Sequence, residues 1–161
     1  LRKVNKTANG YRLLSEAGWE WLARRTSRRN TTIFPWGNDS IVPKKAGNIA
    51  DETARGLVPF YIPNYSDGFP EKAAVGSFPA EKSGLFDLTG NVREWVHDFY
   101  NLQPPRANTV EVDPLGPPFG DVHVIKGSSF RSGTRTTLRA AYREGLAGRR
   151  DDVGFRIGRY L

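Results

Sequence analysis

The chain has 161 residues, of which 38% are apolar and 25% charged, and this composition is typical of a folded globular domain. The absence of cysteine excludes disulfides, zinc–thiolate sites and a cysteine nucleophile within the chain. No apolar run approaches the roughly 20 residues that cross a membrane, and the net charge of +7 comes mainly from arginines after residue 130.

The clearest predicted helix spans residues 11–26. Ser15 is a suitable N-cap, Glu16 lies near the positive end of the helix dipole, and Arg24 and Arg25 lie near the negative end. An apolar stripe with spacing i, i+3, i+4 predicts the buried face, namely Trp19, Leu22 and Ala23.

From residue 35 to residue 84, proline or glycine recurs every few positions, so long regular elements are excluded there. Aromatic residues continue through the same stretch, which indicates ordered loops packed on a core. A second proline-rich loop is predicted over residues 101–120.

Three further segments carry periodic apolar residues. Residues 92–100 suit either a helix or a strand, since Val92, Trp95 and Val96 match a helical stripe while the composition favours a strand. Strands are predicted at His123–Lys126 and at Val153–Arg159. In the last of these, alternation predicts three inward side chains, those of Val153, Phe155 and Ile157.

The arginines near the end of the chain have two interpretations. They form a surface for polyanions or an acidic membrane, or their forked side chains bond loop carbonyls and carboxylates within the fold. The arginines are interleaved with Gly, Ser and Thr rather than with stacking aromatic residues, which favours the structural interpretation over a nucleic-acid partner.

Eight segments, in order, resemble the formylglycine-generating-enzyme (sulfatase-modifying factor) family. They are YRLLSEAGWEWLARR (11–25), FPWGN (34–38), GNIADE (47–52), SDGF (66–69), VGSFPAEKSGLFDLTGNVREWVHDFY (75–100), HVIKGSSFRSG (123–133), LRAAYR (138–143) and DDVGFRIGRY (151–160). The resemblance implies an α+β fold, a C-type-lectin-like variant with short twisted strands, one or two helices and much ordered loop. It also implies a strand at 92–100 and a single domain over residues 1–161. The family's opening part has no counterpart, and the chain starts at Leu1 without any methionine, so we expect a fragment or a processed product.

The same resemblance implies two structural calcium sites. The first would use the Asn48 side chain, the Ile49 carbonyl, the Asp67 carboxylate and the Phe69 carbonyl. The second would use the Asp87 carboxylate, the carbonyls of Gly90 and Val92, and the Glu94 carboxylate. Calcium prefers such mixed oxygen ligands. By spacing alone, Asp87 and Glu94 are more typical of turn formers or salt-bridge partners.

The family's catalytic cysteines, which hold copper, have no counterpart here. Ser132 falls at the first cysteine position and Thr137 at or near the second, while Ser129 is retained and Arg93 replaces a pocket tryptophan. Hydroxyls do not replace thiolates as ligands for Cu(I), so we expect the family chemistry to be absent. Iron oxygenases of the superfamily need more histidines than His97 and His123.

Two functional hypotheses remain. The first is a calcium-stabilised, non-catalytic module with a groove around Ser129, Arg131, Ser132 and Arg93, which would bind a protein, a peptide or a small anionic ligand. The second is a metal-dependent oxidoreductase of the same superfamily whose ligands come from another segment. Placement in a bacterial cell envelope is expected only by analogy with related domains.

Overall fold

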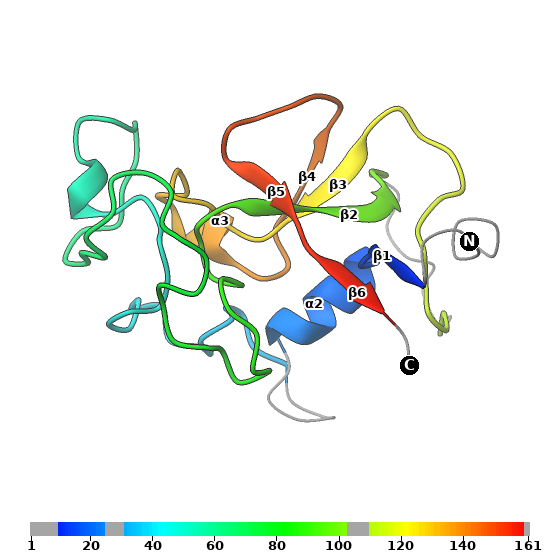
Figure 1. Cartoon of the computed structure of the whole chain (residues 1–161), viewed down its shortest axis with the longest axis horizontal. Coiled ribbons are helices and arrows are strands. Elements are labelled where there is room, and N and C mark those ends of the chain that lie inside the picture. Colours follow the sequence, from blue (N-terminus) through cyan, green and yellow to red (C-terminus); the bar gives the residue numbers. More distant parts are fainter. Residues whose placement is uncertain (1–9, 25–30, 103–109, 160–161) are drawn as a thin grey trace.

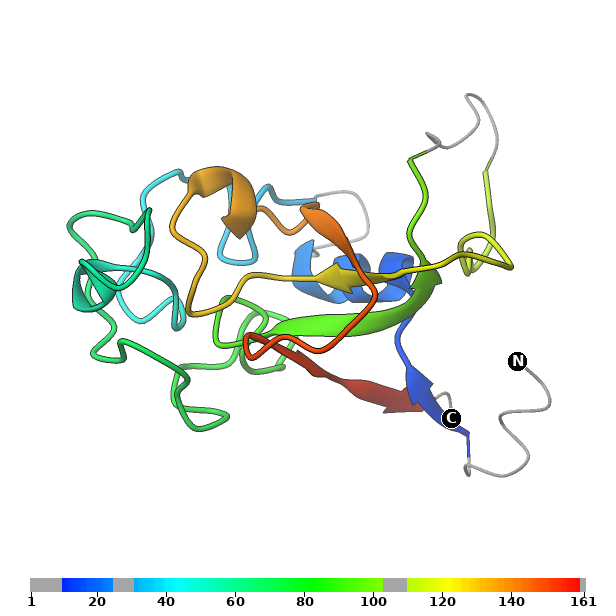
Figure 2. The same cartoon turned by 90° about the horizontal axis from the view of Figure 1, so that it is seen from above.

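The computed structural model describes residues 10–24, 31–102 and 110–159, and Figures 1 and 2 show its short elements joined by long loops. In chain order the elements are β1 (Tyr11–Leu13), α2 (Glu16–Arg24), a single 3-10 turn (Glu52–Ala54), β2 (Arg93–Phe99), β3 (His123–Lys126), α3 (Arg135–Leu138), β4 (Arg143–Leu146), β5 (Val153–Phe155) and β6 (Ile157–Arg159). The predicted α+β class is confirmed.

The strands form two sheets. The larger sheet has the order β4-β3-β2-β5, in which β3 is antiparallel to both of its neighbours and β5 runs parallel to β2. The smaller sheet is an antiparallel ribbon of β1 and β6, with Tyr11 opposite Arg159 and Leu13 opposite Ile157. The last part of the chain therefore belongs to both sheets in turn, passing from β5 into β6 (Figure 1).

Helix α2 packs on the larger sheet through its apolar stripe. Trp19 and Ala23 are buried against Val96 of β2 and Val124 of β3. Ser15 accepts a hydrogen bond from the backbone N–H of Gly18 at 3.1 Å, as expected of an N-cap. The side chain of Lys126 is fully buried beneath the helix, where its ammonium lies 3.2 Å from Glu20 and 3.6 Å from Glu16. This pairing satisfies a charge that burial alone would make costly.

The long loops are anchored by a second apolar cluster of Phe34, Ile49, Tyr65 and Leu138. Residues 40–80 gather at one side of the molecule in both views, away from β1 and β6 (Figures 1 and 2). The prediction that aromatic residues pack these loops on a core is confirmed for Phe34, Tyr65 and Phe78, whereas Phe60 and Phe86 are exposed.

Some boundaries differ from the sequence predictions. Residues 11–13 are a strand rather than the first turn of the helix, because they pair with β6; Arg25 and Thr26 at the predicted helix end lie outside the described residues. The strand expected at Val153–Arg159 is two strands in different sheets, and its predicted inward face is wrong: Phe155 is 69% exposed and Ile157 is 55% exposed.

Other elements agree closely with expectation. The strand at His123–Lys126 has the predicted bounds, and β2 confirms that residues 92–100 are a strand rather than a helix. Within the described residues, neither helix is long and apolar enough to span a membrane.

Candidate functional site

Arginine side chains near the end of the chain are built into the fold. Arg143 donates to the carbonyl of Asn101 at 2.7 Å and pairs with Glu16, while Arg156 donates to the carbonyl of Phe86 at 2.7 Å and pairs with Glu94. These contacts confirm the structural interpretation for both arginines. A polyanion surface is not needed to explain them.

Arg93, the first residue of β2, is the centre of a buried polar network. Its side chain is almost wholly enclosed, and it donates to the carbonyl of Gly127 at 2.9 Å and to Ser132 Oγ at 3.3 Å. The guanidinium also lies over the ring of Tyr142 at 4.9 Å. Burial lowers the pKa of Arg93, and the carboxylates of Glu144 and Asp152 act against that effect.

The two serines of the predicted pocket belong to this network. Ser129 Oγ donates to Asp152 Oδ2 at 2.8 Å, and Ser132 Oγ accepts from the backbone N–H of Ser129 at 3.0 Å. Asp152 lies 3.9 Å from Arg93 Nε, and its backbone carbonyl accepts from the Arg93 N–H at 2.8 Å. Of the residues predicted to line an open groove, three are therefore buried inside the protein, and only Arg131 is exposed.

Thr137 is not part of this network. It lies in α3, where its N–H and hydroxyl bond Thr134 in a capping box. Thr137 is thus explained by the local helix turn. Asp152, by contrast, was missed by sequence reasoning. One signal could have found it: Asp152 directly precedes the strand predicted to begin at Val153. In the structure that strand is β5, which pairs with β2 so that Val153 lies opposite Arg93.

The titration of Asp152 makes the free energy of unfolding depend on pH. Burial raises the pKa of its carboxyl, but hydrogen bonds from Arg150 and Ser129 and the charges of Arg150 and Arg93 outweigh burial, so that the pKa is lowered from 3.8. A carboxyl with a depressed folded-state pKa stabilises the protein above the unfolded-state pKa, and this contribution is lost as the pH falls through the folded-state pKa.

We therefore expect the urea midpoint to fall as the pH drops below about 4. Asp152→Asn should have a lower urea midpoint than the wild type at neutral pH. Its urea midpoint should also change less as the pH falls below about 4. Asp151→Asn is the matched control, because Asp151 is exposed and, among the described residues, forms an ion pair only with the exposed Arg131. Identical pH profiles for the wild type and Asp152→Asn would contradict this assignment.

Three of the four residues of the first predicted calcium site, Ile49, Asp67 and Phe69, are in hydrogen-bond contact, and the fourth, Asn48, directly precedes Ile49 in the chain. The Asp67 carboxylate accepts hydrogen bonds from the backbone N–H of Ile49 at 2.9 Å and of Phe69 at 2.7 Å. The Asn48 amide nitrogen donates to the carbonyl of Glu71 at 2.7 Å, while the buried Asn48 Oδ1 has no hydrogen-bond partner among the described residues. An unpartnered buried oxygen is costly unless another group, such as a cation, satisfies it.

Negative charge is also concentrated at this first site. Asp51 lies beneath it, with Asp51 Oδ2 accepting from the Asp67 N–H at 2.5 Å. Burial raises the pKa of Asp67 to about 6, and the charge of Asp51 adds to that effect. Two carboxylates and an unsatisfied amide oxygen fit a hard cation such as calcium.

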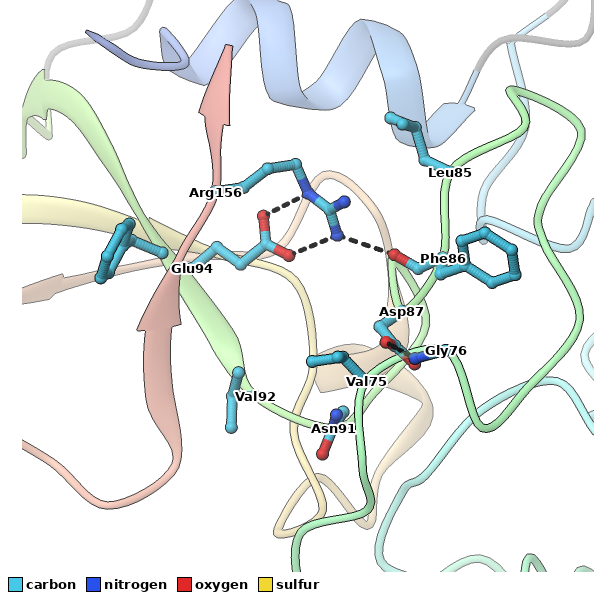
Figure 3. A pocket seen from close by; sticks show the side chains of 10 residues that line it. Val75, Gly76, Leu85, Phe86, Asp87, Asn91, Val92, Glu94 and Arg156 are labelled. Atoms are coloured by element: carbon cyan, nitrogen blue, oxygen red, sulfur yellow. Dashed lines mark hydrogen bonds and ion pairs between the residues drawn. The ribbon is translucent and has the colours of Figure 1, made fainter. Parts of the chain in front are cut away.

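The second predicted site is assembled less completely, as Figure 3 shows. Asp87 Oδ2 accepts from the Gly76 N–H at 2.8 Å, and its buried Oδ1 lacks a hydrogen-bond partner in the described part of the chain. Glu94, however, already pairs with Arg156 at 2.8 Å and accepts from the Trp19 indole N–H at 2.8 Å. The carboxylates of Asp87 and Glu94 face different partners around a pocket of about 430 Å³.

A backbone bridge at Gly90 connects the loops that carry the two predicted sites. Asn48 and Gly90 form a short parallel bridge, and the Asn91 N–H donates to the Asn48 carbonyl at 2.7 Å. Within the described residues, no group of three or more His, Asp or Glu side chains is placed to hold a metal ion. Both sites would therefore depend on amide and backbone oxygens.

The sequence matches the sulfatase-modifying factor enzyme 1-like domain family over residues 2–161. It is 35% identical over 122 residues to the formylglycine-generating enzyme of Bos taurus, a match that covers 75% of this chain and 30% of the bovine protein. It is 30% identical over 122 residues to the inactive C-alpha-formylglycine-generating enzyme 2 of Mus musculus, covering 75% of this chain and 32% of that protein. The chain thus spans about a third of each relative's length.

The fold is also similar to that of PvdO from Pseudomonas aeruginosa. The two structures superpose with a TM-score of 0.67 at 25% identity, over 99% of this chain and 57% of PvdO.

Proposed function

This chain belongs to the sulfatase-modifying factor enzyme 1-like domain family, and on that premise we propose that it is a non-catalytic member stabilised by calcium and used for binding. The observation that carries the proposal is the position of Arg93. Its guanidinium, bonded to Ser132 and close to Asp152, fills the interior where the family resemblance places the first copper-binding cysteine.

The chemistry of this interior supports the absence of copper chemistry. A guanidinium is a permanent cation at physiological pH and cannot ligate a metal ion. Serine and threonine hydroxyls are hard ligands, and Cu(I) selects thiolates. A murine relative whose name describes it as inactive supports the view that members of this family exist without the activity.

We expect the purified protein to leave a cysteine-containing sulfatase peptide unchanged in the presence of Cu(I) and oxygen. A formylglycine-generating enzyme serves as the positive control, and mass spectrometry of the peptide measures the conversion. Metal analysis should find no stoichiometric copper or iron. Conversion of the peptide, or one equivalent of either metal, would overturn the proposal and favour an oxidoreductase.

Calcium would act on stability rather than on chemistry in this proposal. The first site supports it best, because Asn48 Oδ1 is buried without a hydrogen-bond partner among the described residues and the Asp67 carboxylate lies beside it in the same loop cluster. A ligand present at about 100 times its Kd adds about 2.7 kcal/mol of stability. For a chain of this size that corresponds to a rise in melting temperature of about 5–10 °C.

We therefore expect a calcium chelator to lower the melting temperature by about 5–10 °C, as measured by calorimetry. Asp67→Asn should abolish most of the difference between calcium and chelator, whatever its effect on the unliganded protein. Asp39→Asn is the control, since Asp39 lies in an exposed turn, where its Oδ1 accepts a hydrogen bond from the nearby Ile41 N–H. Equal melting temperatures with and without calcium would rule out the calcium role.

A further inference from the structure

The second predicted calcium site already contains a positive charge, the guanidinium of Arg156. The Glu94 carboxylate is buried, and two nitrogens of Arg156 donate to it, Nη2 to Oε1 at 2.8 Å and Nε to Oε2 at 3.1 Å. The Trp19 indole N–H also donates to Oε2, at 2.8 Å. Since a carboxylate offers about four lone-pair positions, most of the acceptor capacity of Glu94 is used by these three hydrogen bonds.

The guanidinium joins the two segments that carry the predicted ligands of this site. Its Nη2 also donates at 2.7 Å to the carbonyl of Phe86, which directly precedes Asp87, while Glu94 lies in β2 (Figure 3). Arg156 follows β5, and the parallel pairing of β5 with β2 places Gly154 opposite Glu94. An arginine of the chain itself therefore provides the cross-link that a calcium ion would provide.

The oxygen atoms that remain at the second site fit calcium poorly. Of the two predicted carboxylates, only Asp87 keeps a buried oxygen, Oδ1, without a hydrogen-bond partner among the described residues. That oxygen and the two predicted backbone carbonyls fall short of the six to eight oxygen ligands that calcium takes. An ion bound to Glu94 would also lie beside the Arg156 guanidinium, and like charges repel strongly where water is largely excluded.

The first predicted site has no such internal cation. Asp67 accepts hydrogen bonds from backbone N–H groups, and in the described part of the chain neither Asp67 nor Asp51 forms an ion pair. We propose that Arg156 replaces calcium at the second site, so that the protein binds one calcium ion, at the first site, rather than two. The inference rests on the calcium role in the proposed function and assigns that role to a single site.

The stoichiometry of calcium binding, measured by isothermal titration calorimetry, tests the inference. We expect one equivalent for the wild type and two for Arg156→Gln, because loss of the guanidinium leaves the Glu94 carboxylate open to a metal ion. A chelator should then lower the melting temperature of Arg156→Gln by about twice as much as that of the wild type. Arg156→Lys is the matched control, since it retains the positive charge, and it should bind one equivalent. Two equivalents for the wild type, or no more calcium on Arg156→Gln than on the wild type, would overturn the inference.

A second variant tests the inference while leaving the pair of Arg156 and Glu94 intact. Asp67→Asn removes a carboxylate from the first site alone, so it should bind no calcium at concentrations that saturate the wild type. One equivalent bound by Asp67→Asn would count against the inference, whether or not Arg156→Gln folds. If the wild type bound no calcium and Arg156→Gln bound one equivalent, the calcium role in the proposed function would fail, while the assignment of Arg156 would hold.

Discussion

Replacing Arg93 with alanine is expected to lower the free energy of unfolding by about 3–5 kcal/mol. The substitution removes the cation from a network in which Ser132 Oγ, the Gly127 carbonyl and Asp152 all face the guanidinium. Asp152 would then keep its buried charge with one cation fewer. Chemical unfolding followed by tryptophan fluorescence measures this difference in free energy. We expect the denaturant dependence of the free energy (the m-value) to be the same for both proteins.

The neighbouring pair provides the control for this prediction. Arg131 and Asp151 form an ion pair between side chains that are about half exposed, at 50% and 56%. Exposed pairs contribute about 0–1 kcal/mol, so Arg131→Ala should have little effect. If Arg93→Ala were as stable as Arg131→Ala, the buried network around Arg93 would not be what stabilises this region.

Replacing Gly90 with alanine is the second substitution expected to be severe. Gly90 has φ of 86°, and a Cβ there would lie 2.0 Å from the carbonyl oxygen of Asn48. The backbone of residues 47–48 would have to move away from residues 89–90, and the bridge between the two loops would break. We expect a loss of about 3 kcal/mol or more, since a left-handed conformation and a backbone clash both contribute.

Gly84→Ala separates the two contributions. Gly84 has φ of 79°, but among the described residues, apart from its two chain neighbours, no atom lies within 4 Å of an added Cβ. Its replacement should cost only about 1–2 kcal/mol, the penalty of the left-handed backbone. Equal losses at Gly84 and Gly90 would show that close packing between the loops contributes nothing. Calcium titration of Gly90→Ala should also show weakened binding, because Asn48 and Asp87 lie on the two loops that the bridge joins.

Local signals predicted much of the fold where the apolar periodicity was regular. The apolar stripe of α2 and the N-cap at Ser15 were recognisable because helix geometry repeats within a few residues. The strand at His123–Lys126 was recognisable for its continuous apolar centre, which the structure buries fully at Val124 and Ile125. The strand at 92–100 needed the family resemblance, because periodicity alone allowed a helix.

Long-range pairing explains where the sequence predictions failed. Residues 11–13 resemble a helix start until β6, far along the chain, pairs with them. The alternation of Phe155 and Ile157 suggested one half-buried strand, but Arg156 turns to reach Glu94 and Phe86, and the chain changes sheets at that residue. Such a switch depends on partners more than sixty positions away, and no local pattern reveals it.

At the candidate sites, too, local patterns identified some residues and missed those that depend on long-range contacts. Ser129, Ser132 and Arg93 lie in one buried network rather than in a groove, and sequence reasoning gave no role to their carboxylate partners Asp152 and Glu144. At the first predicted calcium site, Asp67 bonds the N–H groups of Ile49 and Phe69, while calcium binding there stays a prediction. At the second, Glu94 is a salt-bridge partner, as its spacing alone favoured, but no local pattern identified Arg156 as the cation.

The β1–β6 ribbon joins the two ends of the described chain, so that both ends open together. Each of its strands has three residues and pairs only with the other in the described part of the chain, so neither strand can detach and leave the other protected. Amide hydrogens of Leu13 and Ile157 should therefore exchange with solvent at matching rates, as members of one cooperative opening unit. Opening of that unit would leave β2, β3 and β4 paired, and would free β5 at the margin of the larger sheet to fray first.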